Sequence, residues 1–358
     1  MKVIQVAEYA SGGVATYLRN IISYQLKDER IDKVILINSK YKSENFEFTS
    51  NKFEHHTFEY KRSMTGIGKL LRLRKLIDNL SPDVVQFNSS FSGIIRMSYF
   101  FKKANYKVIY CAHGWSFTQK NASPLKKRGY ALIERMATAR TDLIINISNY
   151  EMFAAIHHGV PELKMKTIHN SISQKQNLRE TENPFRNDLR KLLFIGRFDE
   201  AKGLDFLLNN LKSVNNKVEL VVIGESVLND SHKQRIKMDN VKFLGWVDNE
   251  YIDSYIQYCD AVIIPSIWEG FGLVALEAMK NSKMVISSDT GGLAEIVDDN
   301  VTGLKFKAES RKELQAKLAM FSELSDSEIT QMGKNGFKKF LQKYNNEKLC
   351  NELIESYL

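Results

Sequence analysis

Apolar and polar residues follow two different rhythms along this chain. Short runs of β-branched and other apolar residues are separated by longer segments in which apolar residues recur every three or four positions. The short runs predict buried strands, and the longer segments predict amphipathic helices. Because strands and helices alternate in this way on parallel sheets, the expected fold class is α/β. Strands are expected at residues 3–7, 34–38, 84–87, 108–112, 143–147, 191–195, 218–223, 261–265 and 284–287, and helices at residues 14–26, 67–80, 125–139, 204–211, 273–280 and 311–318.

A polar stretch around Pro184 interrupts the alternation of expected strands and helices. A chain of 358 residues also exceeds the size that one apolar core usually serves. We therefore expect two doubly wound, Rossmann-like domains that face each other across a cleft, with ligands at the carboxyl ends of the strands. The expected order is residues 1–172 as N-terminal domain, 173–188 as linker, 189–340 as C-terminal domain, and 341–358 as a helix that packs back toward the N-terminal domain.

Composition narrows the class of protein. With 43% hydrophobic and 26% charged residues, the chain is globular rather than disordered. Its three cysteines are widely spaced, which argues against a disulfide framework or a zinc site and favours a reducing compartment. No apolar run reaches the length of a membrane span, and a strand is expected at the first residues, with no signal peptide ahead of it, so we expect a cytoplasmic location.

The turn after the first expected strand carries two adjacent glycines. Gly12 and Gly13 stand where a helix is expected to begin, so the backbone can approach a ligand and offer free N–H groups to an anion. The pattern is not G-x-G-x-x-G, so the dinucleotide fingerprint is absent, which disfavours a nicotinamide dehydrogenase. A tight turn without a ligand is the alternative interpretation.

Two cations follow the strand expected at residues 191–195. Arg197 supplies a planar guanidinium, and Lys202, five positions later, supplies a mobile ammonium. On one loop the two groups can converge on a diphosphate. The alternative is that both are merely solvated.

A further loop follows the strand expected at residues 261–265. Gly270 and Gly272 permit close approach of the backbone to a ligand, and the helix that follows begins with Leu273 and Val274. The first N–H groups of that helix lie at its positive end, where they can stabilise a phosphate.

Glu277 stands about one turn into that helix on an otherwise apolar face, where a carboxylate needs a hydroxyl or cationic partner. A surface glutamate on a core helix is the alternative. Together these features resemble the family-4 retaining glycosyltransferases of two-Rossmann (GT-B) architecture, of the type that builds bacterial capsule, O-antigen or exopolysaccharide. The resemblance rests on Glu269 and Glu277 around Gly-Phe-Gly, on Gly196-Arg197 and Lys202-Gly203 upstream, and on Gly12-Gly13 and His113 in the first half.

The resemblance implies how the second domain binds a nucleotide sugar, with UDP favoured as its nucleotide. Arg197 and Lys202 should hold the diphosphate, together with the N–H groups of Leu273 and Val274. Glu277 should accept hydrogen bonds from the ribose hydroxyls.

The resemblance also implies which residues lie near the base and near the transferred sugar. The loop that contains Gly245 should flank the base. Glu269 should contact hydroxyls of the transferred sugar, aided by the N–H groups of Gly270, Phe271 and Gly272.

In the first domain the resemblance points to His113, which follows the strand expected at residues 108–112 and matches the active-site histidine of the family. That histidine lies against the transferred sugar. Gly13, beside Gly12, should approach the phosphate or the acceptor. A lone histidine has a structural role more often than a catalytic one, and its position here favours the catalytic role.

No Asp-x-Asp triplet follows an expected strand, and no cluster of His and carboxylate residues has the spacing of metal ligands. We therefore expect no metal and no cofactor beyond the nucleotide sugar. Cationic side chains and a helix N-terminus should instead offset the charge of the leaving group. The resemblance implies retention of the anomeric configuration, with a phosphate oxygen helping to deprotonate the acceptor.

Basic residues are concentrated in the first half. Residues 1–175 hold 27 Lys and Arg against 14 Asp and Glu, whereas residues 176–358 hold 24 against 28. Interleaved with apolar residues, such cations are typical of membrane-surface elements, which suits a lipid-diphosphate-linked saccharide as acceptor and a peripheral position at the inner face of the membrane. The basic clusters are Lys61-Arg62 with Lys69, Arg72, Arg74 and Lys75, then residues 96–103, then residues 126–128.

Other functions remain open at this point. The basic half could steer a soluble anionic acceptor, such as a sugar phosphate, rather than bind lipid. A nucleotide-sugar epimerase has a similar two-domain form. A nucleic-acid-binding protein would suit the charge, but the basic stretches match no recognised nucleic-acid module and would leave the glycine-rich loops unexplained, so no nucleic acid is expected as partner. The sequence leaves the oligomeric state open.

Overall fold

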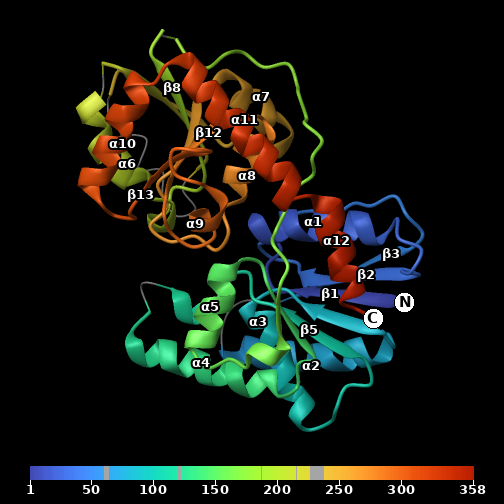
Figure 1. Ribbon diagram of the computed structural model, residues 1–358. Coiled ribbons are helices and arrows are strands. Elements are labelled where there is room, and N and C mark those ends of the chain that lie inside the picture. The colour runs from blue at the N-terminus through green and yellow to red at the C-terminus, as the bar shows by residue number, and fades with distance from the viewer. Residues whose placement is uncertain (60–63, 120–121, 187, 215, 226–237) are drawn as a thin grey trace. The chain divides into compact units, whose positions relative to one another are not determined.

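The computed structural model describes residues 1–358 apart from 60–63, 120–121, 187, 215 and 226–237. The chain divides into two compact units (Figure 1). Unit 1 comprises Met1–Ile172 together with Asn346–Leu358, and unit 2 comprises Ser173–Asn345. Each unit has one parallel sheet and its own apolar core, so the expected α/β class with two Rossmann-like domains is confirmed.

Unit 1 contains a seven-stranded sheet in the order β3-β2-β1-β4-β5-β6-β7, and each neighbouring pair is parallel. The two central strands are almost wholly buried, as strands between two helical layers should be. The strands are β1 Lys2–Ala7, β2 Lys33–Ser39, β3 Phe53–Phe58, β4 Val84–Phe87, β5 Lys107–Cys111, β6 Leu143–Asn146 and β7 Met165–Thr167.

Helices cover both faces of this sheet (Figure 1). Helix α4 shows how the local sequence sets a helix start, because Ser123 caps it by accepting a hydrogen bond from the Lys126 N–H and Pro124 occupies its first position. The helices of unit 1 are α1 Gly13–Gln25, α2 Met64–Asn79, α3 Ser90–Gly93, α4 Pro124–Thr138, α5 Asn149–His157 and α12 Asn346–Glu355.

Unit 2 contains a six-stranded parallel sheet in the order β10-β9-β8-β11-β12-β13. Its strands are β8 Arg190–Ile195, β9 Val218–Ile223, β10 Val241–Gly245, β11 Ala261–Ile264, β12 Met284–Ser288 and β13 Gly303–Phe306. Its helices are α6 Leu204–Leu211, α7 Asn249–Tyr258, α8 Leu273–Lys280, α9 Leu293–Ile296, α10 Arg311–Glu323 and α11 Asp326–Lys343. Among the described residues no helix combines the length and the apolar content needed to cross a bilayer.

The two connecting segments differ from the expected boundaries. The segment expected as a free linker belongs to unit 2, because the Asn177 N–H donates to Asp253 Oδ2 at 2.8 Å and the Arg179 N–H donates to Ser254 Oγ at 2.7 Å, both on α7. Residues 341–343 still belong to α11, and the chain enters unit 1 only at Asn346. Helix α12 then packs against α1 (Figure 1).

Candidate functional site

The candidate site of unit 2 is built from loops at the carboxyl edge of its sheet. The loop after β8 and the loop after β11 are joined by a hydrogen bond from the Ile267 N–H to the Ala201 carbonyl at 2.8 Å. The Phe198 N–H donates to the Glu225 carbonyl at 2.9 Å and so joins the loops after β8 and β9. Neighbouring parallel strands therefore deliver their loops to one place, as the sequence pattern predicts.

These loops bring Lys202 and Glu269 together. Lys202 Nζ lies 2.6 Å from Glu269 Oε2, and the two side chains are 25% and 13% exposed. Ser266 Oγ donates to the same carboxylate oxygen at 3.2 Å. Arg197 is 60% exposed and pairs with Asp199 at 2.9 Å, so its guanidinium is the more accessible cation of the two. The site thus offers one held ammonium and one accessible guanidinium.

Two glycines outside the predicted motifs fix the backbone around Glu269. Gly291 and Gly292 follow β12, and the Gly292 N–H donates to the Gly270 carbonyl at 3.2 Å. Gly291 has φ +58°, and a Cβ there would lie 1.7 Å from the Glu269 carbonyl oxygen. An adjacent pair of glycines shortly after a buried strand is the sequence signal that could have identified them.

Helix α8 begins at Leu273 with Val274 next, directly after the Gly270-Phe271-Gly272 turn. Gly272 is the N-terminal cap with φ +104°. Because the first residues of a helix have N–H groups without intrahelical acceptors, this end of α8 can bind an anion.

Glu277 lies on α8 next to a buried polar cluster. Lys280 Nζ donates to Asp253 Oδ2 at 2.8 Å, and Asn281 Nδ2 donates to Asp253 Oδ1 at 2.6 Å. Burial raises the pKa of Glu277 to about 7; Lys280 opposes this shift, and Asp253 adds to it. Glu277 can therefore change its protonation state near neutral pH.

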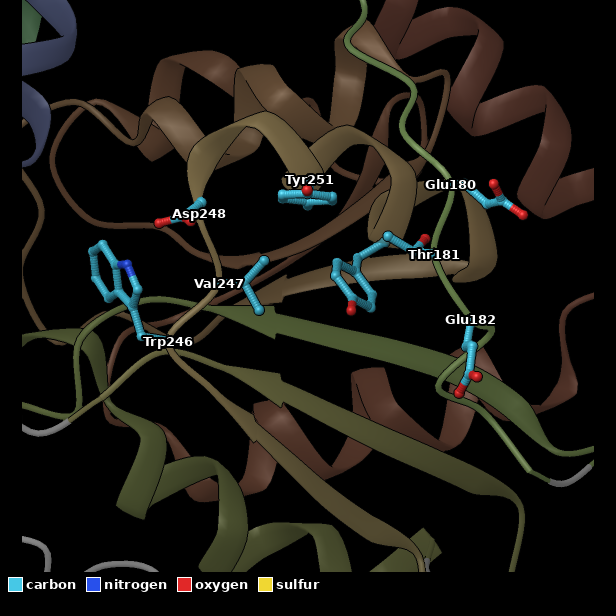
Figure 2. Close-up of a pocket in the computed structure, with 8 residues that line it drawn as sticks. Glu180, Thr181, Glu182, Trp246, Val247, Asp248 and Tyr251 are labelled. Atoms are coloured by element: carbon cyan, nitrogen blue, oxygen red, sulfur yellow. The ribbon is translucent and has the colours of Figure 1, made fainter.

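The loop after β10 is held against the loop after β9, since the Gly224 N–H donates to the Gly245 carbonyl at 2.8 Å. Trp246, the next residue, is 65% exposed. It lines a cavity of about 540 Å³ between α7 and residues 180–182 (Figure 2). The residues assigned to the diphosphate, ribose and sugar are not among those that line this cavity.

The candidate site of unit 1 surrounds His113, directly after β5. His113 has φ +51°, a conformation that is uncommon for residues other than glycine and that clusters at functional sites. Its Nε2 lies 3.4 Å from Asn88 Oδ1, and its ring packs edge-on against Tyr17 with centroids 4.4 Å apart. Burial lowers the pKa of His113 to about 3, so the ring is neutral at physiological pH.

The predicted Gly12–Gly13 turn starts α1. Gly12 has φ +57° in open space, and its N–H donates to Glu44 Oε1 at 2.7 Å. Helix α1 begins at Gly13. Because β1, β4 and β5 are neighbours in the sheet, Gly12, Asn88 and His113 all belong to its carboxyl edge. In the described part of the chain, no three His, Cys, Asp or Glu side chains are grouped so that they could hold a metal ion.

Comparison with known proteins finds a matching family for each half of the chain. Residues 11–176 match the family described as Glycosyltransferase Family 4, and residues 175–339 match the family described as Glycosyl transferases group 1. An uncharacterized 41.2 kDa protein in the cps region of Klebsiella pneumoniae is 34% identical over 316 residues, which are 85% of each chain. The chain belongs to the family-4 glycosyltransferases.

Two more proteins bear on this glycosyltransferase. The O-antigen biosynthesis glycosyltransferase WbnH of Escherichia coli is 28% identical over 236 residues, 64% of this chain and 65% of WbnH. Alr3699/HepE of Anabaena, solved in complex with UDP-glucose, has a TM-score of 0.79 at 17% identity and covers 99% of both chains. This likeness agrees with the expected GT-B fold.

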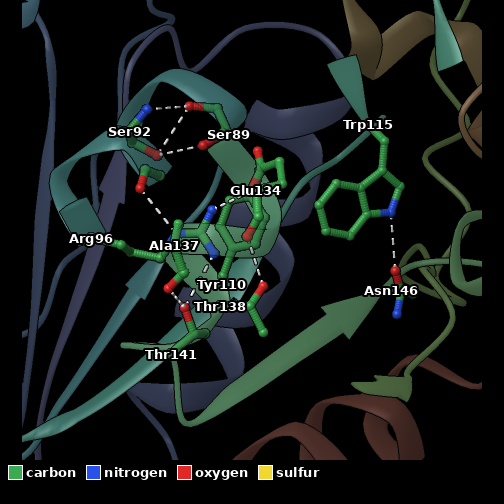
Figure 3. Close-up of polar contacts among 11 residues, drawn as sticks. Ser89, Ser92, Arg96, Tyr110, Trp115, Glu134, Ala137, Thr138, Thr141 and Asn146 are labelled. Carbon is green, nitrogen blue, oxygen red and sulfur yellow. Dashed lines mark hydrogen bonds and ion pairs between the residues drawn. The ribbon is translucent and has the colours of Figure 1, made fainter. Parts of the chain in front are cut away.

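The basic clusters of the glycosyltransferase differ from the expectation in one respect. Arg96 was expected among surface cations, but it is 1% exposed and ion-paired with Glu134 at 2.5 Å (Figure 3). Its guanidinium stacks on the Tyr110 ring at 3.4 Å and donates to Thr141 Oγ1 at 3.2 Å. A carboxylate 38 positions away thus neutralises this cation inside the core.

The basic residues on α2 differ in what they contact. Arg74 donates to the carbonyl oxygens of Ser98 and Lys102, so it ties α2 to the segment that follows β4. Arg72 and Lys75 are exposed. Lys61 and Arg62 lie outside the described residues, as does the side chain of Lys69.

Proposed function

We propose that this glycosyltransferase transfers a sugar, with retention of anomeric configuration, from a UDP-sugar to a lipid-diphosphate-linked saccharide in surface polysaccharide assembly. The observation that carries the proposal is the convergence of Lys202, Glu269 and the start of α8 at one edge of the unit 2 sheet. The cps-region and O-antigen relatives support the pathway, and the UDP-glucose complex of Alr3699/HepE supports the nucleotide.

In the proposed complex, the diphosphate lies against Lys202 and Arg197 and against the first N–H groups of α8. Both cations stabilise negative charge more strongly as it develops on the leaving phosphate than before, which is the requirement for catalysis. These fixed positive groups supply the electrostatic role that a divalent ion has elsewhere, so we propose turnover without a metal. Ionised Glu277 accepts hydrogen bonds from the ribose.

The proposed chemistry is a substitution at the anomeric carbon. The bond from that carbon to the phosphate oxygen breaks, and an acceptor hydroxyl adds from the same face. The hydroxyl proton passes to a phosphate oxygen of the leaving nucleotide. Glu269 binds hydroxyls of the sugar while keeping Lys202 in place, and His113 contacts the sugar as a neutral ring.

The proposed membrane contact rests on the exposed face of α4. Apolar and basic side chains share this face, whereas Ala131, Glu134, Ala137 and Thr138 point into the unit. Side chains of this kind insert into the interface of an anionic bilayer while their cations attract lipid headgroups. We call this the α4 surface: Leu125, Lys126, Arg128, Leu132, Ile133 and Met136.

A screen of nucleotide sugars with nucleotide release as readout tests the proposed reaction. We expect release from one UDP-sugar that depends on an added lipid-linked acceptor and persists in EDTA. Release from other nucleotides only, or loss of turnover in EDTA that a divalent ion restores, would contradict it. Release on a soluble sugar phosphate alone would instead favour a soluble acceptor, and formation of a free epimer would show an epimerase.

A further inference from the structure

A closed ring of four hydrogen bonds lies in the interior of unit 1, and one of its members, Asn88, is next to His113. Gln5 Nε2 donates to Tyr357 Oη at 3.1 Å, and Tyr357 Oη donates to Gln86 Oε1 at 2.8 Å. Gln86 Nε2 donates to Asn88 Oδ1, and Asn88 Nδ2 donates to Gln5 Oε1, both at 2.9 Å. All four side chains are buried, with exposures of 0% to 3%. The ring thus joins the chain beyond α12 to the two central strands.

Two contacts fix the direction of this hydrogen-bond ring. Tyr357 Oη donates to Gln86 Oε1, which turns Gln86 Nε2 toward Asn88 Oδ1. Asn88 Nδ2 also donates to the Gln86 carbonyl oxygen at 3.2 Å, and a carbonyl can only accept. A rotated Asn88 amide would place its oxygen against that carbonyl and leave two buried oxygens facing each other. Asn88 Oδ1 must therefore point toward Gln86 Nε2 and His113.

This direction determines which nitrogen of His113 carries the proton. Asn88 Oδ1 is an acceptor, and it lies 3.4 Å from His113 Nε2, so Nε2 must be the N–H donor. The His113 imidazole is neutral, and a neutral imidazole has one N–H. The second nitrogen, Nδ1, is then an acceptor.

We propose that Tyr357, acting through this hydrogen-bond ring, is a positioning residue that holds His113 as its Nε2–H tautomer, so that Nδ1 accepts a hydrogen bond from a hydroxyl of the transferred sugar. The sugar contact rests on the proposed function, whereas the tautomer does not. Tyr357 suits this task because its hydroxyl also accepts a hydrogen bond from Gln25 Nε2 at 2.9 Å, so it is held from three sides.

The first test is ¹⁵N NMR of the full chain with labelled histidine, with the His113 signals assigned from a His113→Gln variant. We expect a protonated Nε2 and an unprotonated Nδ1 in the wild type, and a mixture of tautomers in Tyr357→Phe. A wild-type ring protonated at Nδ1 overturns the proposal, even if Tyr357→Phe does not fold. An unchanged tautomer in a folded Tyr357→Phe also overturns it.

The second test separates positioning from stability. Tyr344→Phe is the matched control, since Tyr344 is a buried tyrosine of unit 2. We expect Tyr357→Phe to lower kcat about tenfold with little change in the KM of the UDP-sugar, whereas Tyr344→Phe retains kcat. In the wild type, one deoxy analogue of the sugar should be a poor substrate, and this penalty should shrink in Tyr357→Phe. Equal kcat in both variants overturns the positioning role, whereas absence of transfer in the wild type contradicts only the proposed function.

Discussion

Lys202 and Glu269 form an ion pair with 2.6 Å between Nζ and Oε2, although they come from loops after different strands. In the proposed complex the ammonium binds the diphosphate and the carboxylate binds the sugar, so the pair spans the bond that breaks. Each side chain restrains the other before substrate arrives. Such preorganisation reduces the reorganisation that catalysis would otherwise require.

Replacing Lys202 with alanine should weaken UDP binding by about 1.5–3 kcal/mol, because a charge-assisted contact is lost and Glu269 is left without its cation. Arg197→Ala should cost less, since its side chain is 60% exposed. Isothermal titration calorimetry measures both, with the exposed Lys217→Ala as control. Unchanged UDP affinity in both site variants would refute the diphosphate assignment.

Affinity for the UDP-sugar should fall about tenfold between pH 8 and pH 6, because the ribose needs an ionised Glu277 and the pKa of that carboxyl is raised to about 7. The nucleotide sugar itself suits this test, since both of its phosphates are esterified and stay ionised over this range. Glu277→Gln should bind weakly at both values and lose the pH dependence. A variant with the wild-type pH dependence would show that another group titrates.

The pH–rate profile should contain no limb from His113 between pH 5 and 8. Burial lowers the pKa of this histidine to about 3, so the neutral ring is present at every pH well above that value. His113→Gln should therefore reduce kcat while leaving the shape of the profile unchanged. A limb near pH 6.5 that disappears in this variant would contradict the neutral ring.

Gly291→Ala should destabilise unit 2 by more than about 2 kcal/mol and abolish transfer, because the added Cβ would collide with the Glu269 carbonyl at a positive φ. Gly129→Ala is the matched control, since a Cβ at this position in α4 meets nothing within 4 Å. Helix propensity predicts that Gly129→Ala is neutral or stabilising by up to about 1 kcal/mol. Thermal unfolding checks both, and equal stability of the two variants would contradict the close approach.

The α4 surface should bind vesicles that contain phosphatidylglycerol. Lys126→Glu with Arg128→Glu should weaken binding by about 1 kcal/mol or more per residue at low salt and by less as salt rises, whereas Leu132→Ser with Met136→Ser should weaken it at every salt concentration. Charge reversal at the exposed Lys334 and Lys338 of unit 2 is the control.

A vesicle sedimentation assay distinguishes the outcomes for the α4 surface. UDP binding should survive in all of these variants because the nucleotide motifs lie in unit 2. Vesicle binding by the α4 variants at the wild-type level would mean that this surface only faces solvent.

The sequence pattern predicted the inner strands of both sheets and none of the edge strands. The strands it missed, β3, β7, β10 and β13, are the four edges in the described part of the chain. An inner strand is buried on both faces and so reads as a continuous apolar run, whereas an edge strand such as β3 is mostly half-buried and contains polar residues. The hydrophobic pattern that identifies an α/β fold is therefore weaker in the strands at the edges of its sheets.

Site residues were predictable where they share a loop and unpredictable where they meet across the fold. Arg197 and Lys202 stand on one loop after a buried strand, so their spacing is visible in the sequence. Asn88 lies far in sequence from two of its partners, since Gln5 belongs to β1 and His113 follows β5. The wrong expectation for Arg96 has the same cause, since its neutralising Glu134 belongs to another helix.

The hydrogen bond between Gln5 and Tyr357 joins residues 352 positions apart and so sets an order for folding during synthesis. Unit 2 is continuous in sequence, and its strands have all their partners once residue 345 has left the ribosome. Unit 1 begins first but is completed later, because Gln5 of β1 and Gln86 of β4 bind the hydroxyl of Tyr357, which follows α12 in the sequence. Unit 1, whose synthesis starts first, is therefore completed after unit 2, and under the proposed role of Tyr357 its histidine acquires a defined tautomer only after Tyr357 has been made.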